Sequence, residues 1–296
     1  MAAPNRASLI TKTQKVLKKH FEAVHPPADR LLLEHWLYAS VLEDAPGDKA
    51  DEAFARLQED YFELNEVRVT TVTELAETFS CLPQPESAGK RVRAVLQAVF
   101  EADYNYDLEP LKKQNIGKAI KHLEAYQTQD GASITTPFAL AYVTQHALGG
   151  HSIPIDQSGL QLLFILGVIT ESEAEKKQTP GLERAIPKNK GIEFASQLHQ
   201  FSSEFALSPQ STKLRTIIAE INAEAKDRLP KRKTKKEEEA EAEAAEAAEA
   251  KATRKKRAAK KPPAAPVSEA APAKKSSTKK SSKKTEPKGI ARKKPR

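Results

Sequence analysis

Apolar residues recur every three or four positions through most of residues 1–228, and this spacing is typical of amphipathic helices. The first predicted helix covers residues 9–24, with Ser8 as its expected N-cap. Residues 29–43 are apolar on all sides, so we expect the second helix to be central. Residues 66–69 favour a short extended segment. Further helices are predicted at residues 48–62, 72–80, 85–102, 108–126, 137–148, 172–177, 181–186, 191–207 and 211–229. Short helices joined by short loops predict an all-α globule.

Polar residues mark the expected starts of three helices. Thr71 and Glu74 have the spacing of a capping box. Thr136 precedes a proline and is the expected N-cap of the helix predicted at residues 137–148. After Gly149–Gly150, the run "HSIPI" is expected to be extended, and Asp156 stands where the following helix should begin. Aspartate is a preferred N-cap, so a capping role for Asp156 is expected whether or not its charge also serves chemistry.

The composition changes beyond residue 229. From residue 230 onward the chain has 23 Lys and Arg against 9 Asp and Glu, a net charge of +14. Residues 1–229 have 25 against 31, a net charge of −6. An Ala- and Glu-rich segment favours a solitary helix, and the remaining tail has little to bury and is expected to be disordered. A chain with this charge division typically binds a polyanion, nucleic acid first and an anionic membrane second.

The lysine pairs of the tail resemble those of linker histones and of some bacterial DNA-condensing proteins. Such a segment binds phosphates through counterion release and does not read bases. The tail residues expected to contact DNA are Lys274, Lys275, Lys279, Lys280, Lys283 and Lys284.

Several classes of chemistry have no support in the sequence. A single cysteine, Cys81, rules out an internal disulfide, a cysteine-rich zinc site and a four-thiolate iron–sulfur cluster. The seven histidines show no metal-binding spacing, and no G-x-S-x-G motif is present. No cofactor or metal is therefore expected. The chain has no secretory h-region and no apolar run long enough to cross a bilayer, which predicts a cytoplasmic protein associated with nucleoid or chromatin and not with a membrane.

A series of short motifs occurs in a familiar order. An apolar helix precedes "DKADEAFARL", a later helix carries "AGKRVRAVLQAVFE", and a helix–loop–helix leads to "IPIDQS" and then to "FASQLHQFSSEF". This order resembles the endonuclease III-like, helix–hairpin–helix family of DNA glycosylases, over roughly residues 9–206. The resemblance implies a two-lobed helical globule with a discontinuous domain of residues 1–44 and 149–228, a hairpin domain of residues 45–148, and a charged tail of residues 229–296.

The resemblance also implies how DNA would be held. In the family, a glycine-containing hairpin presents backbone N–H groups to a phosphate, and an interlobe pocket receives a flipped nucleotide. An aspartate then stabilises the charge that develops on the sugar, and "IPIDQS" places Asp156 at that position. The hairpin maps to "DGASITTPFALAYV". The implied DNA-binding residues of the globule are Gly131, Ser133, Thr135, Thr136, Lys118 and Lys121.

This sequence departs from the family at the catalytic lysine, the stack-probing glutamine and the cluster-binding cysteines. The lysine position falls between Thr136 and Phe138, where no lysine occurs, so no lyase activity through that residue is expected. An ordinary solvated face is the alternative for Lys118 and Lys121, as it is for Lys90, Arg91 and Arg93. His146 and His151 are expected to be solvated or at the edge of the core, with a position that lines the cleft as the alternative, and His199 is expected to be a packing residue.

The leading functional hypothesis is a DNA-binding protein related to base-excision repair, with N-glycosylase activity centred on Asp156 if it is an enzyme. Two alternatives remain open. One is a non-catalytic or chromatin-architectural DNA-binding protein on the same fold, and the other is a protein-interaction module tethered to DNA by its tail. Asp156 at the mouth of an open interlobe cleft favours the enzyme, whereas a buried cap beside a filled cleft favours the architectural role.

Overall fold

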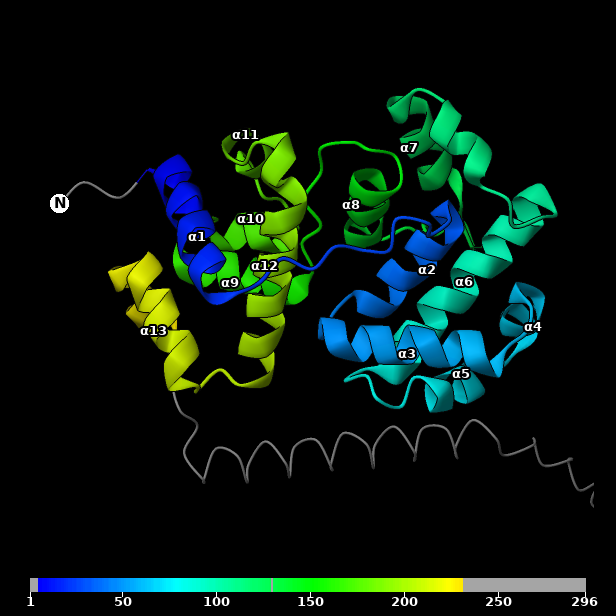
Figure 1. Ribbon diagram of the computed structural model, residues 1–296, viewed down its shortest axis with the longest axis horizontal. Coiled ribbons are helices and arrows are strands. Elements are labelled where there is room, and N and C mark those ends of the chain that lie inside the picture. Colours follow the sequence, from blue (N-terminus) through cyan, green and yellow to red (C-terminus); the bar gives the residue numbers. More distant parts are fainter. Residues whose placement is uncertain (1–4, 129, 231–296) are drawn as a thin grey trace, which may run out of the picture. The chain divides into compact units, whose positions relative to one another are not determined.

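The computed structural model describes residues 5–128 and 130–230 (Figure 1). Within them the regular secondary structure is helical, with one isolated antiparallel bridge between Gln127 and Ser133 and no named strand. The all-α prediction is confirmed. The helices are α1 Arg6–His20, α2 Leu32–Leu42, α3 Gly47–Asp60, α4 Leu64–Val69, α5 Val72–Thr78, α6 Pro85–Asp103, the 3-10 helix η1 Glu109–Lys113, α7 Ile116–Ala125, α8 Pro137–His146, α9 Gln157–Leu166, α10 Glu171–Glu175, α11 Leu182–Ala185, α12 Lys188–Leu207, α13 Thr212–Ile221 and the 3-10 helix η2 Ala223–Arg228.

Helix α2 is the centre of the first of two hydrophobic cores. Its residues are buried around almost the whole helix, including Trp36 and Leu37. It packs against α3, α6 and α8, while α4 and α5 cover α6. Because apolar residues on every side need partners on every side, this helix is central, as its sequence predicted.

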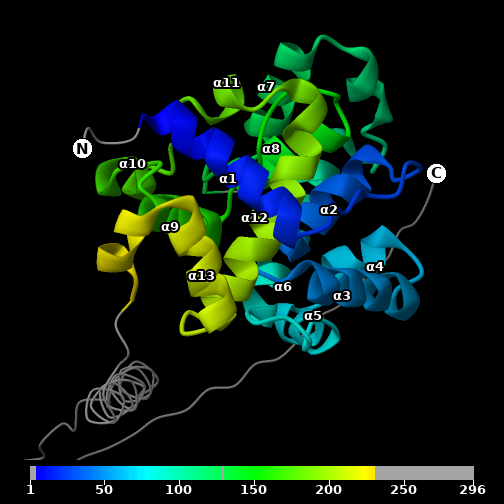
Figure 2. The same cartoon turned by 60° about the vertical axis from the view of Figure 1, so that its left-hand side comes forward.

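The second core is built around α9 and α12. Phe194 and Phe201 of α12 and Leu162 of α9 are fully buried there. Helix α1 packs against α12 and α13 and closes this core (Figure 2). Helix α12 also contacts α8 of the first core, and Figure 1 shows it on the side of the second core that faces the first. The two cores therefore meet along α12.

The predicted start and end of α1 are wrong. Asn5 is the N-cap, with its side chain accepting a hydrogen bond from Ala7 N at 3.3 Å, whereas the Ser8 hydroxyl donates to Asn5 O at 2.8 Å. The helix ends at His20, and Phe21 is extended. Phe21 is buried in the second core. Its packing there ends the helix before the prolines that were expected to end it.

The extended segment expected at residues 66–69 is helical and belongs to α4. Glu63 and Glu66 cap this short helix, and Val67 is buried in the first core. A single six-residue helix is too short to form on propensity alone, so its packing against α6 determines its structure.

Two long predicted helices are each divided. Residues 108–126 form η1 and α7, because Asn115 is extended and its side chain accepts from Gly117 N at 2.9 Å, which caps α7. Residues 211–229 form α13 and η2. Asn222 separates them, with its amide donating to Leu166 O at 2.9 Å from a buried position. A local helical pattern does not reveal either side-chain cap.

All three predicted helix starts are confirmed. Thr71 Oγ1 accepts from Glu74 N at 3.3 Å, and a Glu74 carboxylate oxygen accepts in return from Thr71 N at 3.0 Å. Thr136 Oγ1 accepts from Ala139 N at 3.1 Å. Asp156 Oδ1 accepts from Gly159 N at 2.7 Å. Each contact satisfies an N–H group that has no partner within its own helix.

The domain boundaries at residues 44 and 148 stay a prediction. Side-chain packing differs from them at α2, whose apolar residues belong to the first core rather than to the core formed by α1, α9, α12 and α13. The predicted Ala- and Glu-rich helix and the tail lysines, from Lys274 to Lys284, lie outside the described residues. Among the described helices, none has the length and apolar character needed to cross a bilayer.

Candidate functional site

Asp156 is buried at the junction of the two cores. Its side chain is only 1% exposed. Besides the cap to Gly159, the carboxylate accepts a hydrogen bond from the Ser158 hydroxyl, whose oxygen lies 2.9 Å from both carboxylate oxygens. The second oxygen also lies 3.6 Å from Nδ1 of His199. Both oxygens thus have protein partners, and the carboxylate has no free face toward solvent.

His199 lies between Asp156 and the first core. Its Nε2 is 2.9 Å from the carbonyl oxygen of Ala45. A carbonyl oxygen accepts only, so Nε2 carries the proton of this bond and Nδ1 faces the carboxylate. The ring also packs against Phe138, with 5.8 Å between ring centroids. His199 therefore connects α12 to α8 and to the segment that follows α2.

A second carboxylate, that of Asp44, lies at the same helix end. Asp44 accepts from Gln157 N at 3.3 Å, and its φ of +63° lies in the left-handed region. Burial, followed by the nearby charge of Asp156, raises the pKa of Asp44 above its ordinary value. Two N–H groups in the first turn of α9 are thus occupied by carboxylates of the protein itself.

The preceding residue, Glu43, connects this cluster to α8. Its carboxylate accepts from the Thr136 hydroxyl at 2.8 Å and lies 3.6 Å from Nε of Arg91. Burial raises the pKa of Glu43. The adjacent pair Glu43 and Asp44 therefore joins the starts of α8 and α9. The sequence analysis did not identify this pair, and the only available signal was two acidic residues directly before the helix-breaking "APG".

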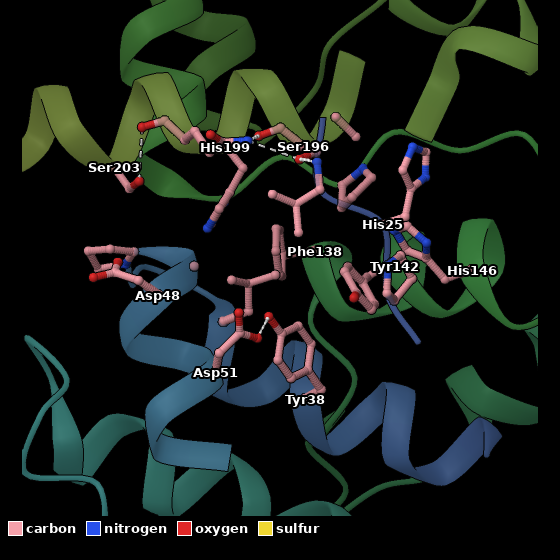
Figure 3. Close-up of a pocket in the computed structure, with 18 of the residues that line it drawn as sticks. His25, Tyr38, Asp48, Asp51, Phe138, Tyr142, His146, Ser196, His199 and Ser203 are labelled. Atoms are coloured by element: carbon pink, nitrogen blue, oxygen red, sulfur yellow. Dashed lines mark hydrogen bonds between the residues drawn. The ribbon is translucent and has the colours of Figure 1, made fainter. Parts of the chain in front are cut away.

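An open cavity of about 630 Å³ lies beside this cluster, between the two cores. Its walls come from the segment between α1 and α2, from α2, α3 and α8, and from α12 (Figure 3). His199 lines it, but Asp156 does not. The size is within the range of small-molecule sites. Asp156 is thus a buried cap separated from an open cavity by the His199 ring.

One wall of the cavity is aromatic. Tyr142 lies between Tyr38 and Phe138, with ring centroids 5.9 and 6.3 Å away. The Arg30 guanidinium lies 4.0 Å from the Tyr38 ring centroid. All three rings are buried, with exposed fractions of 8% for Tyr38, 2% for Phe138 and 6% for Tyr142, so most of each ring packs against protein. Arginine over the face of an aromatic ring is a cation–π contact.

Two histidines pack next to this aromatic wall. His146 lines the cavity, its ring lies 4.3 Å from that of Tyr142, and His35 stacks on His146 at 6.2 Å. Burial is the main cause that lowers the pKa of each to about 4, and nearby positive groups, including Arg30, add to it. Both rings are therefore uncharged at neutral pH. Nδ1 of each is buried without a hydrogen-bond partner. His199 packs on Phe138, as the sequence analysis expected, and also lines the cavity, whereas His146 lines the cavity, which was the alternative to a solvated or core-edge position.

The opposite side of the cavity is acidic. Asp48 and Asp51 project from α3, and Glu204 lines the cavity from α12. The Tyr38 hydroxyl donates to Asp51 at 2.6 Å, which keeps that carboxylate directed along the cavity wall (Figure 3). Burial and this bond raise the pKa of Tyr38. Arg30 lies next to this acidic side, since its guanidinium packs on the ring of Tyr38, whose hydroxyl holds Asp51. These residues are far apart in sequence, so no local sequence motif could identify them.

The predicted hairpin residues lie between α7 and α8. Gly131 has a φ of +79°, and its N–H donates to Thr128 O at 2.8 Å in a tight turn. Ser133 is exposed, whereas the Thr135 hydroxyl donates to Leu123 O at 2.8 Å. Because the Thr136 hydroxyl is engaged by Glu43, it is not free for another acceptor.

Lys118 and Lys121 are exposed on α7, and within the described residues neither forms an ion pair. Lysines of this kind are free to contact phosphate. No group of three or more metal-binding side chains occurs in the described part of the chain. The two lysines thus lie on α7, the hairpin between α7 and α8, and Asp156 at the start of α9, while the six tail lysines are not among the described residues.

Comparisons with known proteins gave results for structures only. No protein family and no curated protein matches the sequence. The chain is similar to endonuclease III in a trapped covalent complex with DNA, with 15% identity, a TM-score of 0.48, and coverage of 67% of this chain and 86% of the other. It is also similar to a thermostable thymine-DNA glycosylase, with 15% identity, a TM-score of 0.44, and coverage of 67% and 85%.

A third similar structure is the H. pylori 3-methyladenine DNA glycosylase (MagIII) bound to 1,N6-ethenoadenine, with 14% identity, a TM-score of 0.41, and coverage of 75% and 95%.

Proposed function

We propose that this protein binds duplex DNA and accommodates an extrahelical nucleotide in the cavity between its two cores, in a role related to base-excision repair. The observation that carries the proposal is the cavity itself, with its aromatic wall of Tyr38, Phe138 and Tyr142. A flat base gains stacking energy against such rings, which offsets part of the cost of leaving the duplex.

A second set of groups, on α7 and on the hairpin that follows it, supports contact with a phosphate backbone. The exposed turn at Gly131 lies between α7 and α8, and Lys118 and Lys121, which form no ion pair among the described residues, lie on α7. These groups supply N–H and ammonium donors, which fix the position of a protein on a duplex without reading its sequence. The net charge of +14 from residue 230 onward adds a sequence-independent attraction, which is consistent with a location at nucleoid or chromatin.

A cavity-blocking variant tests the proposal. Gly47 lines the cavity at the start of α3, and a Cβ there meets no atom within 4 Å, so Gly47→Trp can place an indole in the opening. Ala55→Trp, at an exposed position of the same helix, is the matched control. With full-length protein, we expect Gly47→Trp to remove the preference for a duplex with one unpaired nucleotide over a fully paired duplex, while Ala55→Trp retains it. Equal affinity of the wild-type protein for both duplexes contradicts the proposal.

N-glycosylase activity is a second proposal, and it requires Asp156 to become accessible. The carboxylate oxygens accept from Ser158 and Gly159, and the His199 ring lies 3.6 Å away, so these neighbours have to move before the charge can face a sugar. Incubation with duplexes that carry assorted damaged bases, followed by detection of abasic sites, measures this activity. Release that is lost in Asp156→Asn supports the enzyme. No release from any substrate, combined with retained duplex binding, supports the non-catalytic alternative.

A further inference from the structure

The surface around α4 carries two exposed apolar side chains that belong to neither core. Phe62, directly before this helix, is 94% exposed, and Val69 at its end is 61% exposed. Among the large apolar side chains that the structure describes, Phe62 has the highest exposed fraction. Single exposed apolar residues are common, whereas neighbouring ones mark interaction surfaces. The relative position of these two side chains is therefore informative.

Glu66 connects these two side chains on the exposed side of α4. Its carboxylate accepts a hydrogen bond from Phe62 N at 2.9 Å. It also precedes Val69 by three positions, and residues at this spacing are neighbours on a helix. Val67, on the other side of the helix, is buried in the first core. Phe62, Glu66 and Val69 are therefore presented together to solvent.

The same side of α4 is acidic. We call the exposed acidic and apolar residues of segment 59–69 the α4 face, and they are Glu59, Asp60, Phe62, Glu63, Glu66 and Val69. In residues 5–128 and 130–230, none of these four carboxylates forms an ion pair. The arginine of α4, Arg68, donates instead to Gln97 at 3.0 Å and lies 4.3 Å from the ring centroid of Phe100. Residues 47–78 hold nine Asp and Glu against three Lys and Arg, a net charge of −6, which equals that of residues 1–229.

These properties define the chemistry of a partner. Unpaired carboxylates repel phosphates, so the α4 face fits a cationic partner and not a nucleic acid. The exposed phenyl and isopropyl groups gain free energy when apolar side chains cover them, so the partner also needs an apolar residue. Residues 250–296 of this chain have the positive charge, but Val267 and Ile290 are their only aliphatic or aromatic side chains larger than alanine, proline aside. A basic segment of another protein, with aliphatic residues among its lysines, fits better.

We propose that the α4 face is a docking surface for a lysine- and arginine-rich segment of a partner protein, with Phe62 as its apolar anchor. An aliphatic residue of the partner covers the Phe62 ring, and the surrounding carboxylates pair with the partner's cations. Figures 1 and 2 both show α4 at the edge of the first core that lies away from α12, and α12 forms one wall of the cavity. The inference therefore goes beyond the proposed function and does not depend on it.

The experiment measures binding of a fluorescent peptide to full-length protein by anisotropy. The peptide has about twelve residues, with leucines at helical spacing on one side and lysines elsewhere. A second peptide has alanine in place of each leucine. Phe62→Ser removes the anchor, and because the side chain is 94% exposed, the fold does not depend on it. Leu207→Ser is the matched control, at a position on α12 that is 61% exposed.

We expect Phe62→Ser to weaken binding of the leucine–lysine peptide by about tenfold, because a buried aromatic anchor contributes strongly to an interface. Leu207→Ser should stay within about twofold of the wild type. Glu59→Lys reverses one charge of the α4 face and should weaken binding by about fivefold at low salt, with a smaller effect at high salt. Glu175→Lys, which changes an exposed residue at the end of α10, is its control and should leave binding unchanged. Thermal unfolding of every variant confirms that it is folded.

The outcomes separate this partner from other occupants. Binding that both α4-face variants weaken and both controls retain supports the proposal. No binding of the leucine–lysine peptide at low salt, or equal binding of the alanine peptide, contradicts it. Peptide binding that appears only with saturating duplex identifies the chain's own lysine-rich residues as the occupant, and self-association that Phe62→Ser removes identifies a second copy; each contradicts a separate partner. Duplex binding by Phe62→Ser should equal that of the wild type, so this proposal and the proposed function fail independently.

Discussion

Two carboxylates near the junction of the cores, Asp156 and Asp51, differ in their exposure to solvent and in their hydrogen-bond donors. Asp156 is 1% exposed and accepts hydrogen bonds from a backbone N–H and a hydroxyl. Asp51 is exposed, lines the open cavity and has the Tyr38 hydroxyl as its hydrogen-bond donor. The motif drew attention to Asp156, whereas the accessible carboxylate has no motif. A position in a pattern therefore does not establish that a side chain can reach a ligand.

The largest expected effect is on stability. Asp156→Ala removes a cap and leaves the Gly159 N–H and the Ser158 hydroxyl without their acceptor, so we expect it to lower the free energy of unfolding by about 3 kcal/mol. Asp51→Ala should cost about 1 kcal/mol or less, because solvent reaches the groups that remain. Urea unfolding of both variants measures the difference. Equal losses would show that the two carboxylates are equally structural.

The cavity wall should be sensitive to acid. Burial lowers the pKa of His146 to about 4, so stability from the neutral ring is complete above the unfolded pKa of about 6.5 and is lost as the pH falls from there toward 4. His146→Leu should reduce this loss by about 2 kcal/mol. Urea unfolding between pH 7 and pH 4 measures it, with His122→Leu as an exposed control on α7. An unchanged pH profile in His146→Leu would contradict the assignment.

The negative charge of Asp44 should destabilise the folded protein, because it lies near that of Asp156 at the start of α9. Because burial and Asp156 raise the pKa of Asp44, its contribution to stability is present at low pH and is lost as the pH rises through the folded pKa. Asp44→Asn should therefore stabilise the protein at neutral pH by about 1 kcal/mol, and asparagine tolerates the left-handed φ. The free energy of unfolding at pH 7, against Asp48→Asn as control, measures this. A destabilised variant would show that the bond to Gln157 outweighs the charge repulsion.

The smallest expected effect concerns the contacts that keep the Asp156 carboxylate buried. Ser158→Ala removes the hydroxyl that lies 2.9 Å from both carboxylate oxygens, and we expect a loss of about 1 kcal/mol or less, because the Gly159 cap remains. If base release by the wild type is detectable, this variant should increase it, since one contact that holds the carboxylate closed is absent. A rate below that of the wild type, at equal folded fraction, contradicts closure by Ser158.

Local sequence was sufficient for helix type and for several caps. Thr71, Thr136 and Asp156 each cap a helix through the N–H three residues further on, and such short-range geometry depends on few other residues. The apolar character of residues 29–43 likewise predicted a central helix, because each of its sides needs a buried partner.

Tertiary contacts decided what local patterns left open. Helix α4 forms where an extended segment was expected, because Val67 packs in the first core. The cavity joins Arg30, Asp51 and His199 from three separate elements, and such a set leaves no signature in residue spacing. Burial of the Asp156 carboxylate depends on His199, which lies on α12 far along the chain. The sequence by itself determined which residues start helices, and only the packing of the two cores decided which charges stay accessible, because accessibility is a property of everything that surrounds a side chain.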